Sequence, residues 1–346
     1  MTRADATGIS GSCPRVPVRL LASELVPGVA EAFGNLDGSM RRDGAHWLVI
    51  RREGTITICE VDADPSRVLG DRATWTHPDP NTPGTYCSPL PGGAMAISGP
   101  ETVTVHEADG AVRWEHRHGG RSHASDSSGA CTPDPAGRVL LVATAGPLDP
   151  GRPYAGDVCR ALDLATGEVL GEHVLPSRVA AYEFQGFPDG RPEVLLTASM
   201  GQDGTLCFLV TRTDGRLGVR ATGTVTEACV GVGSEGALVI QDVGGGYLIR
   251  TQDGTDEVLV EAGAVLPPDR MFIGYTPGFV DDRRILVVTA EEQWAEEGIH
   301  LLLDARTLRP LAELDYPRPP GVTAVPLGDG TWLTYDEDTV RRWTTA

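Results

Sequence analysis

Three of the eight histidines of this 346-residue chain fall within eight residues of one another. The segment, HRHGGRSHASDSSG, carries His116, His118, His123 and Asp126. Imidazoles beside a carboxylate form sites for transition metals, and a histidine near a carboxylate can serve as a general base. No other segment supplies a further ligand for a metal site, because the remaining histidines that we considered fall within expected strands. We therefore expect no metal, and these four residues are the candidates that a metal would use.

Two long polar segments supply candidate binding residues. They are GPLDPGRPYAG, from Gly146 to Gly156, and EEQWAEEG, from Glu291 to Gly298. The candidates in and beside them are Asp149, Arg152, Tyr154, Asp157, Glu291, Glu292, Trp294, Glu296 and Glu297. Aromatic faces attract cations, and carboxylates neutralise the charge of a cation. The second segment therefore predicts a binding site for a cationic or aromatic ligand. The alternative is a solvated acidic loop whose tryptophan packs on a neighbouring strand.

Several catalytic groups are missing from the sequence. All 29 cationic side chains are arginines, so no lysine is available for a Schiff base or for a Gly-Lys-Ser/Thr phosphate-binding loop. The seven cysteines show no Cys-x-x-Cys spacing, and no Gly-x-Ser-x-Gly nucleophile motif occurs. If the protein is an enzyme, the candidate catalytic residues are His123, Tyr154, Asp157 and Glu292. No cofactor is predicted.

Composition narrows the range of partners and compartments. Forty-eight acidic residues against 29 arginines give a net charge of −19, which disfavours nucleic acid and anionic membranes as partners. No run of 18 apolar residues occurs, and the first 23 residues lack the apolar core of a secretion signal. The odd number of cysteines is typical of reduced thiols. We expect a monomeric, cytoplasmic protein from a GC-rich bacterial genome.

A repeat organises the whole chain. Seven short apolar runs recur about every 47 residues, most of them just after a glycine turn. They begin at Trp47, Ala94, Val139, Val194, Ala237, Ile285 and Trp332. Each run is too short for a helix and is apolar on both faces, which is typical of a strand buried between two layers. A second hairpin follows several runs, as in TVTVHEADGAVRWE from Thr102 to Glu115, so each repeat holds about four strands.

Four-stranded units repeated around an axis form a β-propeller. We predict an all-β fold: a seven-bladed β-propeller with antiparallel four-stranded blades, as one domain over residues 1–346. The blades are expected at residues 33–76, 84–118, 129–176, 180–222, 228–261, 271–316 and 321–346. The last of these has room for only three strands. Residues 15–23 are expected to supply its fourth strand and close the ring, after a flexible segment at residues 1–14.

Three segments carry a resemblance to known repeats. DTVRRW, from Asp338 to Trp343, resembles the end of the third strand of a WD40 repeat. His123, followed by GACTPDPAGRVLLVATA, resembles the opening of such a repeat, and ALDLATGEVL is similar to both WD40 and YVTN/quinoprotein-like blades. The Gly-His pair is absent, and Trp343 is followed by Thr344 instead of aspartate. The chain is thus similar to a divergent WD40-like propeller, and this resemblance implies a structural role for His123 at a turn.

The resemblance implies that the protein binds a partner, and it implies no particular reaction. In a propeller, loops of one face gather around the axial opening, and the two long polar segments are expected on this top face, from blades three and six. We expect a non-catalytic scaffold that binds a protein or peptide there. The alternative is a small-molecule lyase, isomerase, cyclase or hydrolase with an acidic site in the axial pocket. A closed cavity holding two or more of Asp157, Tyr154, His123 and Glu292 would favour that enzyme.

Overall fold

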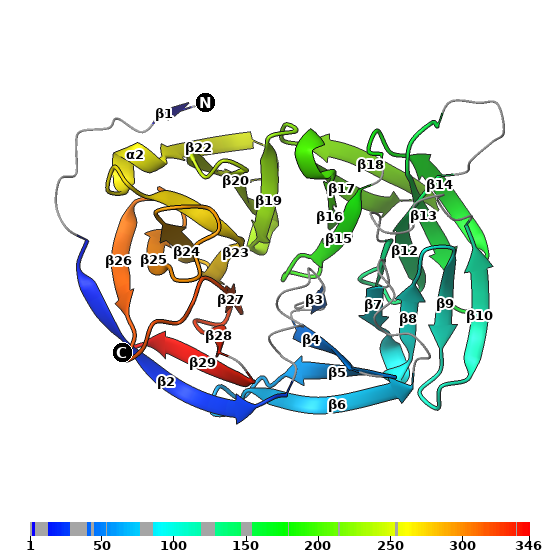
Figure 1. Ribbon diagram of the computed structural model, residues 1–346. Coiled ribbons are helices and arrows are strands. Elements are labelled where there is room, and N and C mark those ends of the chain that lie inside the picture. The colour runs from blue at the N-terminus through cyan, green and yellow to red at the C-terminus, as the bar shows by residue number, and fades with distance from the viewer. Residues whose placement is uncertain are drawn as a thin grey trace. The chain divides into compact units, whose positions relative to one another are not determined.

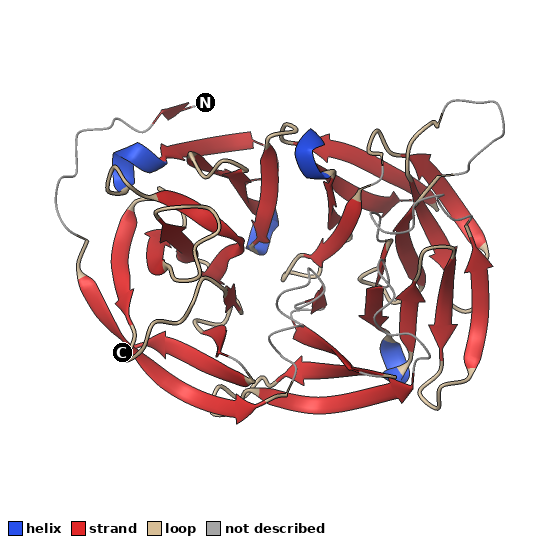
Figure 2. Ribbon diagram, viewed as in Figure 1, coloured by secondary structure: helices blue, strands red, loops and turns tan. Residues whose placement is uncertain are grey.

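The computed structural model describes residues 2–3, 13–27, 40–42, 45–52, 54–76, 86–118, 129–146, 154–178, 180–213, 215–252, 255–336 and 338–346. β-Strands dominate this part of the chain, and helix is confined to short turns (Figure 1, Figure 2). These turns are η1 (Pro91–Gly93), η2 (Gly201–Asp203), η3 (Ser234–Gly236) and α2 (Ala262–Val265). No helix among the described residues is long and apolar enough to cross a membrane.

The chain divides into two compact units. Unit 1 comprises Met1–Phe33, Glu60–Asp71 and Thr226–Ala346, and unit 2 comprises Gly34–Cys59 and Arg72–Val225. One four-stranded sheet contributes residues to both units. It consists of β3 (Met40–Arg42), β4 (Ala45–Arg52), β5 (Thr55–Val61) and β6 (Leu69–Thr76).

Unit 2 contains three four-stranded antiparallel sheets, each built from strands that follow one another in the sequence. The first has β7 (Tyr86–Pro89), β8 (Met95–Ser98), β9 (Thr102–His106) and β10 (Val112–Arg117). The second has β11 (Ala130–Pro133), β12 (Val139–Thr144), β13 (Val158–Asp163) and β14 (Val169–Val174). The third has β15 (Ala181–Gly186), β16 (Val194–Ser199), β17 (Thr205–Thr213) and β18 (Arg216–Thr222).

Unit 1 contains larger sheets because strands from the start of the chain join them. A five-stranded sheet has β1 (Thr2–Arg3), β22 (Thr255–Glu261), β21 (Tyr247–Gln252), β20 (Ala237–Asp242) and β19 (Glu227–Val232), in that order. The first half of an eight-stranded sheet has β23 (Met271–Asp281), β24 (Arg284–Ala290), β25 (Ile299–Asp304) and β26 (Pro310–Asp315). Its second half has β2 (Arg15–Leu25), β29 (Thr339–Thr345), β28 (Trp332–Asp336) and β27 (Ala324–Pro326).

The strand β2 joins the two halves of the eight-stranded sheet. Arg15 lies opposite Glu313 in a parallel pairing with β26, whereas Val18 lies opposite Thr345 in an antiparallel pairing with β29. Val18 also packs into a buried cluster with Trp332 and Trp343. The three-stranded set β27 to β29 thus gains a fourth strand from residues at the start of the chain (Figure 1).

The seven apolar runs lie on strands β4, β8, β12, β16, β20, β24 and β28, as the repeat predicts. All six residues of β12 are buried, whereas the outer strand β14 of the same sheet is mostly exposed. Buried residues of the β11–β14 sheet, such as Leu141, pack against Tyr182 and Leu196 of the β15–β18 sheet in one cluster. Layers of apolar contact on both faces therefore explain why these runs do not alternate with polar residues.

The cysteines occupy recurring positions. Cys87, Cys131 and Cys229 lie on the first strands β7, β11 and β19, and Cys59, Cys159 and Cys207 lie on the third strands β5, β13 and β17. All six are buried and none forms a disulfide. Burial raises the pKa of Cys59 to about 11, so this thiol stays protonated at neutral pH.

A buried arginine ties the last strand to a distant turn within unit 1. Arg342, on β29, is 1% exposed. Its Nη1 atom donates to the carbonyl oxygens of Asp62, Asp64 and Arg67, in the turn between β5 and β6. Its other donors reach Asp329 and Thr331.

Candidate functional site

An open groove lies in unit 1, with a volume of about 1020 Å³. One wall is the loop between β24 and β25, residues 291–298, and the other is the end of β26 with the segment that follows it, residues 313–320. We call this hollow the acidic groove. Its charged and aromatic lining residues are Arg270, Glu291, Glu292, Glu296, Glu297, His300, Glu313, Tyr316 and Arg318.

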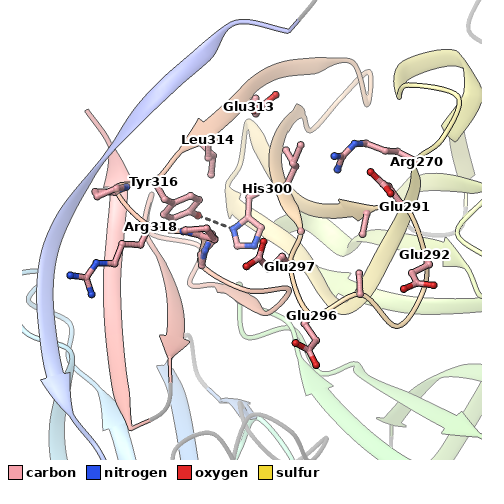
Figure 3. A pocket seen from close by; sticks show the side chains of 17 residues that line it. Arg270, Glu291, Glu292, Glu296, Glu297, His300, Glu313, Leu314, Tyr316 and Arg318 are labelled. Carbon is pink, nitrogen blue, oxygen red and sulfur yellow. Dashed lines mark hydrogen bonds between the residues drawn. The ribbon is translucent and has the colours of Figure 1, made fainter.

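Negative charge predominates in the acidic groove, where five glutamates face two arginines. Glu291, Glu292, Glu296 and Glu297 are all exposed, because they occupy a loop between two buried strands. Glu313 differs from them, since the Arg15 guanidinium lies 2.8 Å from its carboxylate. In Figure 3, Arg318 and Glu291 lie on opposite sides of His300. The field of the loop carboxylates favours a positively charged ligand.

The histidine beneath the groove has hydrogen-bond partners at both ring nitrogens. His300 Nδ1 lies 2.9 Å from the Tyr316 hydroxyl (Figure 3). Its Nε2 lies 3.2 Å from the carbonyl oxygen of Gly321. The indole of Trp332 donates to the same Tyr316 hydroxyl at 2.7 Å. His300 is 1% exposed, and burial lowers its pKa to about 4. Burial likewise raises the pKa of Tyr316. Neither group is therefore poised for proton transfer at neutral pH.

Local sequence explains the shape of the second wall. The segment from Tyr316 to Gly321 reads YPRPPG, and its three prolines fix φ and cannot donate a backbone hydrogen bond. Gly321 has a φ of 77°, in the left-handed region that glycine adopts readily. A side chain at this position would be strained, so the turn that follows the prolines requires glycine.

The predicted residues of the 291–298 loop take different places. Glu291, Glu292 and Glu296 line the acidic groove. Trp294 is 78% exposed and is not among the lining residues. The tryptophan is therefore exposed and does not pack on a neighbouring strand, as the alternative expected it to do.

The first predicted segment contributes a buried cluster in unit 2. Asp157 is completely buried and accepts hydrogen bonds from the hydroxyls of Tyr154 and Tyr182 and from the backbone amide of Ala180, the last at 3.2 Å. Tyr154 also accepts from the amide of Gly146 at 2.8 Å. Three donors compensate the buried carboxylate, which is what a structural role requires. Tyr154 and Asp157, predicted as binding or catalytic residues, are therefore hydrogen-bonded to one another in this cluster.

The remaining predicted residues come from the histidine-rich segment and from the first polar segment. Asp149, Arg152, His123 and Asp126 lie outside the described residues. His118 is buried, and its Nε2 donates to the carbonyl oxygen of Gly99 at 3.1 Å. Burial, with the charge of Arg160, lowers the pKa of His116. In the part of the chain that the structure describes, no three His, Cys, Asp or Glu side chains are grouped to hold a metal ion.

Sequence reasoning missed half of the acidic groove. Arg270, Glu313, Tyr316 and Arg318 were not among the candidates, although they line it. They lie in two separate stretches of the chain, around residue 270 and in residues 313–318, and only folding brings those stretches to the 291–298 loop. The available signal was the proline-rich stretch YPRPPG, which marks an irregular segment between two strands.

Comparisons with known proteins concern the fold. No protein-family model matches the sequence, and no curated protein matches it. A structure from work on two prolyl endopeptidases is similar with a TM-score of 0.54 and 10% identity, over 90% of this chain and 47% of that chain. This chain thus spans about half the length of that protein.

Two further structures cover most of their own length. BamB from Moraxella catarrhalis has a TM-score of 0.49 and 11% identity, over 94% of this chain and 99% of that chain. A streptogramin B lyase has a TM-score of 0.49 and 13% identity, over 90% and 94%. These neighbours are β-propeller-like proteins. The described residues form an all-β fold rich in four-stranded antiparallel sheets, and the similarity to the prolyl endopeptidase structure, with its TM-score of 0.54, supports a β-propeller-like fold.

Proposed function

We propose that this protein is a non-catalytic binding scaffold, whose acidic groove receives a positively charged segment of a protein or peptide. The observation that carries the proposal is the lining of the groove: five glutamates against two arginines around an open hollow of about 1020 Å³. Exposed carboxylates on a fixed framework attract arginine and lysine side chains. Trp294, in the same loop, offers an exposed aromatic face on which a guanidinium can stack.

The scaffold that we propose is a seven-bladed, WD40-like β-propeller in one domain. Six sets of four consecutive strands support it, from β3–β6 to β23–β26, together with the set β27–β29 completed by β2. The pairing of β2 with β29 supports closure of the last blade by the start of the chain. The cytoplasmic location expected from the sequence belongs to the same proposal.

An enzyme has less support than a scaffold. Of the four residues that would favour it, the acidic groove contains Glu292 alone among those described. Asp157 is buried and bonded to two tyrosines, and His300 has a partner at each nitrogen. A group in such a state has neither the access nor the free proton site that general acid–base catalysis needs.

A peptide-binding assay tests the scaffold. An oligo-arginine peptide is expected to quench the fluorescence of Trp294, with an affinity that falls as salt rises. The triple variant E291Q/E292Q/E296Q is expected to bind at least about tenfold more weakly. The matched control, E101Q/E168Q/E257Q, removes the same charge from exposed sites that do not line the groove. Equal losses in both triple variants, or no binding by the wild type, would overturn the proposal.

A further inference from the structure

One imidazole contacts both ends of the proline-bearing wall of the acidic groove. His300 is bonded to Tyr316 at the start of the segment and to Gly321 at its end. We infer that His300 is a positioning residue, which fixes this wall so that the groove has its shape before a ligand arrives. The effect of His300 on ligand binding rests on the proposed function, whereas its effect on the structure of the wall does not.

The directions of the hydrogen bonds form a single consistent chain. A carbonyl oxygen only accepts, so Nε2 of His300 must carry the proton that is donated to Gly321. In a neutral ring, Nδ1 then has a lone pair and accepts from the Tyr316 hydroxyl. The Tyr316 oxygen in turn accepts from the indole of Trp332. Burial lowers the pKa of His300 to about 4, so the ring is neutral near pH 7 as this chain requires.

Aromatic packing holds the members of this chain in place. The rings of His300 and Tyr316 meet edge to face with centroids 5.2 Å apart, and those of Tyr316 and Trp343 do the same. Trp332 and His300 are almost completely buried. Edge-to-face aromatic pairs in a close-packed core keep side chains in single orientations. Both anchors of the wall are therefore set by the core of unit 1.

The wall itself needs such anchors. Pro317, Pro319 and Pro320 have no backbone N–H, so half of the six residues cannot be fixed by donating to a neighbouring strand. The two hydrogen bonds that the His300 side chain makes at the ends of the segment replace the backbone hydrogen bonds that a strand would make to its neighbour.

The opposite wall is connected to the same anchor. The buried cluster of Ile273, Val288 and Ala290 contacts residues on both sides of the groove. Ala295, in the 291–298 loop, packs against it, and so does Val322, next to Gly321. A shift of Gly321 would thus disturb the packing of Val322 beside that loop. His300 in this way positions both sides of the acidic groove.

Nuclear magnetic resonance of the wild-type imidazole tests the inference directly. At pH 7 the long-range ¹⁵N–¹H spectrum of His300 is expected to show the neutral tautomer with the proton on Nε2. A proton on Nδ1, or a charged ring, would overturn the inference, because Tyr316 could then not donate to the ring. This measurement needs no variant and no ligand.

Variants separate positioning from stability. In H300Q, the backbone order parameters of Gly321 and Val322 are expected to fall from about 0.85 to below about 0.6. Y316F keeps the imidazole and is expected to cause a smaller fall, which keeps the test available if H300Q does not fold. The control S177A removes a different buried hydrogen bond, between the hydroxyls of Ser177 and Tyr182 at 2.7 Å in unit 2, and is expected to leave both order parameters unchanged. Equal order parameters in wild type, H300Q and Y316F would overturn the inference.

The same variants report on binding. Oligo-arginine affinity is expected to fall about tenfold in H300Q and to stay within about twofold in S177A, because only H300Q loses the preformed groove. A wild type that binds no peptide would refute the proposed function, yet the tautomer and order parameters would still decide whether His300 fixes the wall. Unchanged affinity in H300Q, with a wild type that binds, would refute the positioning role in binding.

Discussion

The guanidinium of Arg342 donates to the carbonyl oxygen of Asp62 at 2.5 Å, across 280 positions of sequence. The same Nη1 atom reaches the carbonyls of Asp64 and Arg67 at 3.3 and 3.2 Å. On its other side, Arg342 meets the carboxylate of Asp329. Burial raises the pKa of Asp329, but hydrogen bonds from Thr331 and the charge of Arg342 outweigh burial and hold that pKa below its usual value. One buried side chain therefore fixes a turn that is remote in sequence.

Replacing this arginine is expected to be costly. R342M fills similar space but removes the shared donor of three carbonyls, of which that of Asp64 keeps the backbone amide of Arg67, and should lower the free energy of unfolding by about 3 kcal/mol or more. Urea denaturation followed by circular dichroism measures the loss. The neighbouring variant R341M is the control, because Arg341 forms a partly exposed ion pair with Asp336 at 3.4 Å, and such pairs contribute little to stability. A similar loss in both variants would contradict the role that we assign to Arg342.

The Asp157 cluster predicts a second stability effect, within unit 2. In D157N the amide NH₂ group replaces one carboxylate oxygen, so a tyrosine hydroxyl or the amide of Ala180 loses its acceptor. We expect the free energy of unfolding to fall by about 2–3 kcal/mol. The variant Y154F/Y182F should fall at least as much as D157N, because it takes both tyrosine hydroxyl donors from the buried carboxylate and leaves it the backbone amide of Ala180. Stability of D157N equal to that of the wild type would refute the structural role of Asp157.

Glu183 predicts a dependence of stability on pH. Burial raises the pKa of this carboxyl on β15 to about 7, and the hydrogen bond from Gln185 lowers it only in part. The folded state thus holds a proton that the unfolded chain releases near pH 4.5. The stability contributed by the protonated group is complete below about pH 4.5 and is lost as pH rises through about 7.

The variant E183Q, which stays neutral, tests this expectation. Its melting temperature should exceed that of the wild type at pH 8 by about 2–4 °C, and should match it near pH 4.5. E168Q, at an exposed site of the same unit, is the control and should show no difference at either pH. A melting curve for E183Q that follows the wild type at every pH would show that Glu183 does not titrate in this way.

Truncation tests the pairing of β2. Deleting residues 1–24 removes almost all of the strand between β26 and β29, and cooperative unfolding should be lost. Deleting residues 1–12 removes β1 but keeps β2, so this shorter deletion should melt close to the wild type. Calorimetry of both chains provides the comparison. An unchanged melting temperature after the longer deletion would refute the closure of the last blade.

Much of the fold follows from local pattern. The apolar runs at Val139 and Ile285 could be assigned to buried strands because β-preferring residues stand between turn residues at a regular interval. Gly110 and Gly137 could be placed in hairpin turns, and both have the positive φ that such turns require, 87° and 66°. These features depend on a few neighbouring residues, so the sequence contains them directly.

The candidate site depends on contacts that no local pattern encodes. Tyr316 and His300 are 16 residues apart, and Trp332 lies another 16 residues further on, yet one hydroxyl joins all three. Asp157 likewise meets Tyr182 across 25 residues. Composition identified the acidic loop, since four glutamates in eight residues are unusual between two strands. It did not identify the opposite wall, whose residues acquire their role only when β26 packs beside β25.

The position of β2 also constrains how the molecule is made on the ribosome. Arg15 leaves the ribosome early, but its partner Glu313 is added almost 300 residues later. At roughly 5–20 residues per second, the first long strand waits on the order of 15–60 s for the strands that it joins. During this time its edges are unpaired and open to other chains. We expect a nascent-chain chaperone to matter more for this protein than its modest apolar content indicates.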